Sequence, residues 1–508
     1  MSIIFIILWR FKGLYRLTNY FRKSIIVIVH LRRVSRKGAS IVVKTARLKR
    51  DFTEGSYFKP ILLFSLPIIL TNLIQQLYSV ADNIVVGKFS GDPLALAAVG
   101  TTTSVSGLLL NFIVGLAAGA GVVVAHAVGA KDNKAVSRMT HTIISLSLML
   151  GFGIGIPSAA LAKPLLVLTN TPTELTDSAA VYLSIIFLGF PAVSVYNFAA
   201  AILRAAGDSK TSLIVLSSSG ISNVVLNVVF VVGFKMSVVG VALATVISQY
   251  ASAAIIIAIL LKRKNQPYAL KIKSLRLDGA IISRTVKMGL PAAIQNCMFS
   301  LANLMITVAV NALSTAAISA KAIFMNLISL MNAITSSYTA VNATFAGQNF
   351  GAGKHRRITK GLLISLLQAT VISLAACLTT LFFLTPLGSL YIDSADPARE
   401  AILAEIRSVG SVIFPVYFIG GIMNCLSGTL RGMGFSFFNM IISVVGICGF
   451  RITWILTAFN LPAFHSLRGV YISWPISWGI VTVAFAIIFA VMIKRLYSEE
   501  KQAKTSKL

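Results

Sequence analysis

Acidic residues are scarce in this chain of 508 residues, which contains only 15 Asp and Glu against 45 Lys and Arg. Charged residues of both signs make up only 12% of the sequence, while hydrophobic residues make up 56%. A typical soluble domain carries about a quarter of its residues as charges. The composition therefore excludes an ordinary soluble globular protein.

Groups that bind metals or perform catalysis are also few. The four cysteines all fall in apolar stretches and are interpreted as small buried hydrophobic residues: Cys297, Cys377, Cys425 and Cys448. The five histidines are scattered and show no metal-ligand spacing. We therefore predict no metal and no cofactor. Because no clustered catalytic groups are found either, we predict that the protein is not an enzyme.

The basic residues account for a formal net charge of +30, which at first suggests a nucleic-acid partner. They lie, however, in short segments between apolar runs of 20 or more residues. This arrangement is the positive-inside pattern of helical membrane proteins, so no nucleic-acid partner is predicted. The apolar runs are continuous rather than alternating, which excludes a transmembrane β-barrel.

Twelve membrane spans are predicted from these runs, and the sequence is interpreted as an all-α, multi-pass membrane protein. The spans cover residues 60–86, 94–126, 135–160, 175–203, 211–233, 239–261, 280–310, 318–348, 358–384, 398–429, 437–457 and 469–493. With the N-terminus inside, 37 Lys and Arg fall on the cytoplasmic side and six on the outer side. We therefore expect both termini to be cytoplasmic.

The two halves of the chain resemble each other at an offset of 222 to 229 residues. The segment SLPIILTN (65–72) matches GLPAAIQN (289–296), and LRAAGDS (203–209) matches LRGMGFS (430–436). Parallel repeats with a site between them are a transporter architecture, although a duplication can also be retained for packing alone. The predicted parts are a basic N-terminal extension (1–56), an N-lobe (57–262), a cytoplasmic linker (263–278), a C-lobe (279–496) and a cytoplasmic tail (497–508).

Asp82 is the acid that the span pattern leaves inside the membrane without a nearby basic residue, except Lys88 at the span exit. A charged side chain at mid-bilayer costs about 2.5 to 3.5 kcal/mol on insertion scales, so a functional role is the default hypothesis. The structural alternative is an acid that is satisfied by a neighbouring helix.

The region from about residue 52 to residue 496 resembles the multidrug and toxic compound extrusion (MATE) family. The resemblance is carried by TEGSYFKPILLFSLPIILTNLIQQLYSVADNIVVGKFSGDPLALAAVG, by LRAAGDS and by the pair VGVALATVISQ and RGVYISWPISW. It implies two six-helix pseudo-twofold lobes in a V shape. It also implies an antiporter that exports organic cations in exchange for H⁺ or Na⁺ by rocker-switch alternating access.

The resemblance also assigns roles in the first half. Asp82 resembles the acid that takes up the coupling ion, and Gln75 resembles its polar neighbour. Pro67 stands where the first helix bends in part of the family. Asn223 and Asn227 stand where the archaeal-type pattern has an Asn and an Asp, so one carboxylate is missing and a single-proton carrier is favoured.

The remaining candidates line or approach the expected cavity: Asn72, Asn296, Met298 and Arg451. Since the second half has no acid at its membrane midplane, the DNA-damage-inducible branch of the family fits better than the norfloxacin-pump branch. The expected partners are small organic cations and drugs and the lipid bilayer, with a monomer in the cell membrane. The alternative function is a lipid-linked oligosaccharide flippase of the same superfamily, for which Arg451 is the candidate base.

Overall fold

The computed structural model describes residues 51–89, 94–169, 171–394 and 396–505. The chain divides into two units, Met1–Arg50 and Asp51–Leu508. Most of the predicted basic extension lies outside the described residues. The fold below is that of the second unit.

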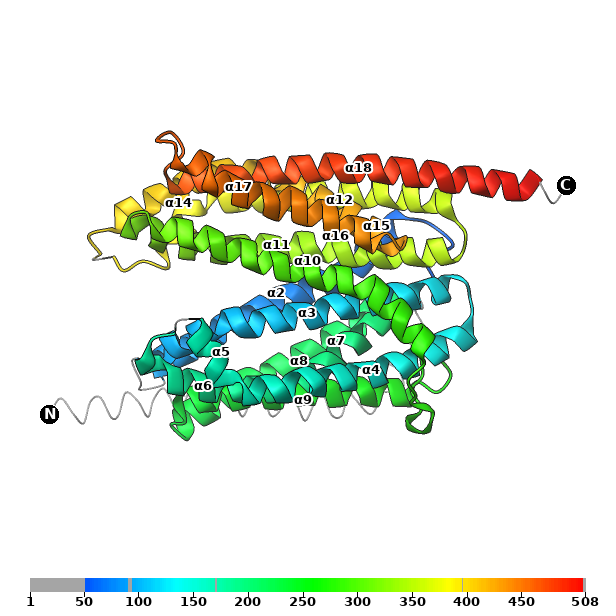
Figure 1. The fold of residues 1–508 in the computed structure, drawn as a ribbon, viewed down its shortest axis with the longest axis horizontal. Helices are drawn as coiled ribbons and strands as arrows, with labels where there is room; N and C mark the ends of the chain where they lie inside the picture. The colour runs from blue at the N-terminus through cyan, green and yellow to red at the C-terminus, as the bar shows by residue number, and fades with distance from the viewer. Residues whose placement is uncertain (1–50, 90–93, 170, 395, 506–508) are drawn as a thin grey trace. The chain divides into compact units, whose positions relative to one another are not determined.

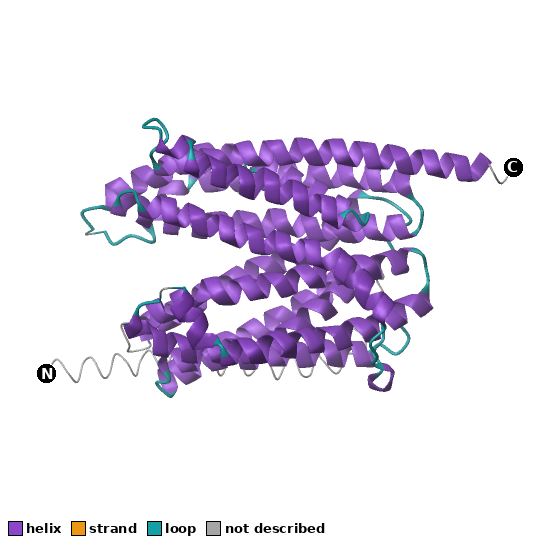
Figure 2. Cartoon of the chain, in the orientation of Figure 1, coloured by secondary structure: helices purple, strands orange, loops and turns teal. Residues whose placement is uncertain are grey.

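Helices make up nearly all of this unit (Figure 2). The helices of the first half of the sequence are α2 (Phe58–Phe89), α3 (Ala95–Gly129), α4 (Asn133–Ala160), α5 (Ala162–Leu168), α6 (Thr173–Leu188), α7 (Phe190–Ala205), α8 (Ser209–Asn227), the π-helix η1 (Val228–Gly233) and α9 (Ser237–Lys262). After the short 3₁₀-helix η2 (Ile272–Ser274), those of the second half are α10 (Gly279–Asn311), α11 (Thr315–Gly351), α12 (His355–Phe382), α13 (Leu384–Ser389), α14 (Arg399–Ile413), η3 (Phe414–Val416), α15 (Phe418–Gly432), α16 (Ser436–Ser443), the π-helix η4 (Val444–Gly449), α17 (Phe450–Leu456), η5 (Ala458–Asn460) and α18 (Leu467–Thr505). Figure 1 shows α3–α9 packed together in blue to green, and α10–α18 in green to red.

Among the described residues, ten helices are long and apolar enough to cross a membrane, and twelve spans result if each of two bent pairs is one span. The pairs are α6 with α7, bent by 42°, and α14–η3 with α15, bent by 47°. The sequence explains both bends. A Phe-Pro dipeptide begins α7 at Pro191, and another lies in η3 at Pro415. Proline cannot donate the backbone hydrogen bond that would continue the preceding helix. The chain is thus an all-helical membrane protein, as predicted.

The repeated LRxxG motif ends a helix in the same way in both halves. Gly207 and Gly434 have φ of +82° and +95°, a conformation that glycine adopts without steric penalty. The N–H of Gly207 donates to Arg204 O, and that of Gly434 donates to Arg431 O. Asp208 N donates in addition to Leu203 O, and Phe435 N donates to Leu430 O, which completes the Schellman motif that closes α7 and α15. The motif therefore places the two arginines in equivalent last turns.

Helix α3 connects the halves because it packs against both α10 and α11. Glycines bring these backbones together. A Cβ atom added to Gly119 would lie 2.2 Å from Gly289 Cα, and one added to Gly129 would lie 1.8 Å from Gln348 O. A Cβ on Gly351 would in turn lie 2.0 Å from His126 O. Helices whose interfaces carry small residues can approach at backbone distance.

Two hydrogen bonds reinforce the end of this interface. His126 Nε2 donates to Gly432 O at 2.7 Å, and Gln348 Nε2 donates to Ala205 O at 2.8 Å. In the sequence repeat His126 matches Gln348, and Ala205 matches Gly432. We call these two bonds and the glycine crossings beside them (Gly129 and Gly351) the α3–α11 contact. A side chain of each half therefore donates a hydrogen bond to the equivalent backbone carbonyl of the other half.

Candidate functional site

A polar cavity of about 730 Å³, the main cavity, lies between helices of the two halves. It is lined by residues of α2, α3, α7, α8, α9 and α11. Asp82 carries the only carboxylate among the described residues that line this cavity. A second cavity of about 370 Å³ is lined by α3, α7, α10, α11 and α15, and the two cavities share several lining residues, among them Asn197 and Arg204. Volumes of about 300 to 1,000 Å³ suit drug-sized ligands.

Asp82 lies at one end of a chain of polar side chains that crosses from α2 to α8 and α9. Asn227 Nδ2 donates to Asp82 Oδ1 and also to Asn223 Oδ1, the latter at 3.2 Å. Asn223 Nδ2 donates in turn to Thr245 Oγ1 at 3.4 Å. The structure thus brings together three predicted coupling residues and adds a threonine that the sequence did not reveal.

Asn227 is fully buried, and its Oδ1 atom has no hydrogen-bond partner among the described residues. The carboxylate of Asp82 accepts only, so it fixes the amide with Nδ2 toward the acid. The Oδ1 atom of Asn227 is therefore a buried acceptor without a partner, near the carboxylate of Asp82. Oxygen atoms of this kind can accept a hydrogen bond from a proton donor or bind a cation.

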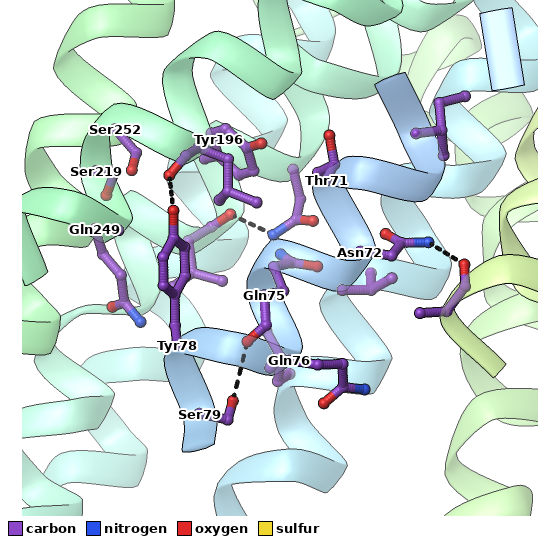
Figure 3. A pocket seen from close by; sticks show the side chains of 18 of the residues that line it. Thr71, Asn72, Gln75, Gln76, Tyr78, Ser79, Tyr196, Ser219, Gln249 and Ser252 are labelled. Carbon is purple, nitrogen blue, oxygen red and sulfur yellow. Dashed lines mark hydrogen bonds between the residues drawn. The ribbon is translucent and has the colours of Figure 1, made fainter. Parts of the chain in front are cut away.

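Other α2 side chains link this helix to both halves (Figure 3). Tyr78 donates through its hydroxyl to Leu216 O of α8 at 3.0 Å, and Asn72 Nδ2 donates to Ser337 Oγ of α11 at 2.9 Å. Gln75 lies between them on α2 and lines the main cavity. The predicted residues Asn72 and Gln75 are therefore both at this cavity.

Pro67 lies inside α2, which continues as one helix from Phe58 to Phe89. Proline lacks the N–H that would bond one turn back, so the helix is weaker at this point. Thr71 Oγ1 donates to Pro67 O at 2.7 Å, one turn further on. Pro67 is buried and lies outside the residues that line the two cavities.

Not every predicted cavity residue lines one of the two cavities described here. Asn296 lines the second cavity, whereas Met298 and Arg451 line neither. Arg451 is buried inside the second half, where its Nε donates to Ser477 Oγ at 3.2 Å. Its guanidinium carbon lies 4.4 Å from the ring centre of Trp474, and such an aromatic face attracts a cation. Arg451 therefore lies away from the two cavities described above.

Two basic cavity residues were missed because the sequence pattern assigned them to cytoplasmic segments. Arg204 lines both cavities, and Arg431 lines the second. Each lies in the last turn of a helix rather than in a loop. The signal that could have revealed them was the LRxxG repeat, which puts an arginine at the same place in both halves.

An all-helical membrane protein built from a parallel repeat, with a polar cavity between its halves, has the architecture of a secondary transporter. Its sequence matches the profile of the family described as MatE over residues 67–230 and 291–457. The chain belongs to the MATE family of transporters, which is not an enzyme family.

Relatives and solved structures agree with this assignment. The probable multidrug resistance protein YpnP of Bacillus subtilis is 30% identical over 61% of this chain and 68% of its own length. The probable multidrug resistance protein NorM of Thermotoga maritima is 25% identical over 86% of this chain and 91% of its own length. The fold matches that of a MOP superfamily transporter from Pyrococcus furiosus with a TM-score of 0.82, at 20% identity over 89% of this chain and 99% of that one.

Proposed function

We propose that the protein is a multidrug efflux antiporter that exports organic cations in exchange for H⁺ through Asp82. The observation that carries this proposal is the position of Asp82, which brings one carboxylate to a drug-sized cavity in a transporter fold. An organic cation and a proton that compete for one carboxylate are exchanged rather than carried together. The names of the YpnP and NorM relatives support drugs as substrates.

A proton is favoured over Na⁺ because the acid has amide neighbours rather than a second carboxylate. Asn227 and Asn223 occupy the places from which such a carboxylate would reach Asp82. The described lining of the second cavity holds no acid. A single carrier acid in the first half supports assignment to the DNA-damage-inducible branch of the family.

The transport cycle that we propose is a rocking of the two halves, residues 57–262 and 279–496, about the α3–α11 contact. The basic residues between the spans support a cell-membrane protein with both termini in the cytoplasm. In this orientation the α3–α11 contact lies at the cytoplasmic end, since α3 and α11 end there. The helices of one chain supply both cavities, which supports a monomer as the working unit.

The flippase alternative receives less support. Its candidate base, Arg451, packs against Trp474 and is absent from both cavities. A cavity of about 730 Å³ also suits a drug-sized molecule rather than a lipid-linked oligosaccharide.

The proposal is tested with inverted membrane vesicles that accumulate ethidium when they are energised. We expect Asp82→Asn to abolish accumulation because amide side chains do not exchange protons. Asp177→Asn is the matched control, since Asp177 is an exposed residue that pairs with Lys163. A protonophore at constant sodium should collapse accumulation by the unaltered protein. Equal accumulation by Asp82→Asn would disprove the carrier role, and accumulation sustained by a sodium gradient alone would replace H⁺ by Na⁺.

A further inference from the structure

Arg204 and Arg431 are positive charges that the proposed exchange at Asp82 does not use. They occupy equivalent positions in the two halves, each in the last turn of a helix that ends in a Schellman motif. The side chains of both line the second cavity. The repeat therefore brings two guanidinium groups to one cavity, one from each half.

Neither arginine has an acidic partner in an ion pair within the described part of the chain. Arg431 is only 8% exposed. Its Nη2 donates to Gln295 Oε1 at 3.2 Å, but its buried Nε lacks a hydrogen-bond partner. A buried charge without a partner is costly, and such groups are normally paired. This site therefore has unused capacity to bind an anion.

The described residues around the two arginines do not neutralise their charges. The other polar residues lining the second cavity are neutral: Asn197, Gln295, Asn296, Asn332, Ser336, Thr339, Thr344, Asn424 and Ser427. The helix C-termini at Ala205 and Gly432 carry partial negative charge that offsets part of the cost of the two cations. Their last carbonyls, however, already accept hydrogen bonds from Gln348 and His126.

We propose that Arg204 and Arg431 bind the carboxylate of zwitterionic substrates, whose cationic group lies toward Asp82. The main cavity is lined by both Asp82 and Arg204, so the two opposite charges face one connected space. A guanidinium donates two parallel hydrogen bonds to a carboxylate, which makes arginine well suited to this group. This inference rests on the proposed function and adds to it a binding site, made by one arginine from each half, for the acid group of such substrates.

The test uses two fluorescent dyes that differ only at the acid group. Rhodamine 110 carries a free carboxylate, and rhodamine 123 is its methyl ester. Binding to the purified full-length protein is measured by fluorescence anisotropy, and export is measured in proteoliposomes. We expect Arg204→Gln and Arg431→Gln each to weaken rhodamine 110 binding by about tenfold or more, as expected for the loss of a charge-assisted hydrogen bond. Rhodamine 123 binding should change by less than about twofold.

Matched variants separate this role from folding. Arg468→Gln removes an exposed arginine and should leave the binding of both dyes unchanged. Arg204→Lys and Arg431→Lys keep the charge and should retain part of the preference for rhodamine 110. If the glutamine variants do not fold, benzoate is titrated against the unaltered protein. It should displace rhodamine 110 but not rhodamine 123, and displacement of neither dye or of both equally would overturn the proposal.

The outcomes also distinguish this inference from the proposed function. Arginine-dependent rhodamine 110 binding without export of either dye would retain the anion site and reject the efflux function. If rhodamine 123 is exported but rhodamine 110 binding does not depend on either arginine, the efflux function is retained and the anion site is rejected. Arginine-dependent binding of farnesyl pyrophosphate, with no binding of rhodamine 110, would overturn the carboxylate proposal in favour of a phosphorylated lipid.

Discussion

At the scale of single residues, the site depends on amides that position a carboxylate. Asn227 is held by Asp82 on one side and by Asn223 on the other, and both bonds use its Nδ2 atom. Asn223 and Asn227 are one turn apart on α8, so the helix itself sets their separation. We therefore propose that Asn227 positions the carboxylate of Asp82.

We predict that Asn227→Ala lowers the initial rate of proton-driven ethidium export by about tenfold. A hydrogen bond to a charged group contributes about 1.5–3 kcal/mol, and 1.4 kcal/mol corresponds to a factor of ten. The rate is measured at a fixed pH gradient and normalised to the amount of protein in the membrane. Asn303→Ala, at an exposed position on α10, is the control. An unchanged rate in Asn227→Ala would show that Asp82 needs no such support.

Asp82 could be singled out from the sequence because an acid in an apolar span is conspicuous, whereas Asn223 and Asn227 were singled out by the resemblance to the family. The structure joins the three side chains by hydrogen bonds. Arg204 and Arg431 could not be singled out, since a basic residue near a span end resembles the many that lie in cytoplasmic segments. The packing of Arg451 could not be predicted either, because a sequence does not show that Trp474 faces it from α18.

At the scale of helices, twelve spans were predictable from apolar length, while the breaks within two of them were not. The Phe-Pro pairs at 190–191 and 414–415 were visible as a repeat, but a proline in a span indicates a bend only when the packing around it is known. The close approach of α3 to α11 was equally hidden. Its glycines are informative only once their neighbours are known.

We predict that Gly351→Ala destabilises the protein by about 1–3 kcal/mol, the usual cost of overpacking. The added Cβ would lie 2.0 Å from His126 O, a backbone atom that can move only if α3 moves. Gly153→Ala on α4 is the matched control, because a Cβ there meets no atom within 4 Å. The control should be neutral or slightly stabilising, since alanine favours a helix. Thermal unfolding of both variants in detergent provides the measurement, and equal midpoints would refute the close contact.

At the scale of the two halves, the α3–α11 contact decides how readily they separate. The described residues supply it with two equivalent hydrogen bonds, His126 to Gly432 O and Gln348 to Ala205 O. Arg284 Nη2 also lies 3.3 Å from His126 Nδ1, which can accept a bond because Nε2 is the donor to Gly432 O. A transporter needs such a contact to be weak enough to break in each cycle. Hydrogen bonds and close helix packing meet this requirement better than a buried ion pair would.

We predict that His126→Ala and Gln348→Ala each shift the population toward separated α3 and α11 ends by at least about fivefold. Each variant loses a neutral hydrogen bond to a backbone carbonyl, which contributes about 1 kcal/mol or a factor of about five, and also the bond from Arg284 to His126 or from Phe52 N to Gln348 Oε1. The bonds of the two residues involve different partners, so the double variant should shift the population by at least about 25-fold if they act independently. Distances are measured between spin labels at Lys134 and Arg356, exposed positions near the contact, after replacement of the native cysteines.

The control for this prediction is His465→Ala, which removes a histidine that bonds to Phe459 O within the second half. It should leave the label distances unchanged, because neither residue bridges the halves. In the double variant a second, longer distance should appear, and it should increase further when glycine-to-alanine changes are added at the contact. A distance distribution in the double variant identical to that of the unaltered protein would show that these two hydrogen bonds are not what holds the α3 and α11 ends together. The barrier to rocking would then reside in the helix crossing at Gly129 and Gly351 and in the other bonds between the halves, such as the one from Asn72 Nδ2 to Ser337 Oγ.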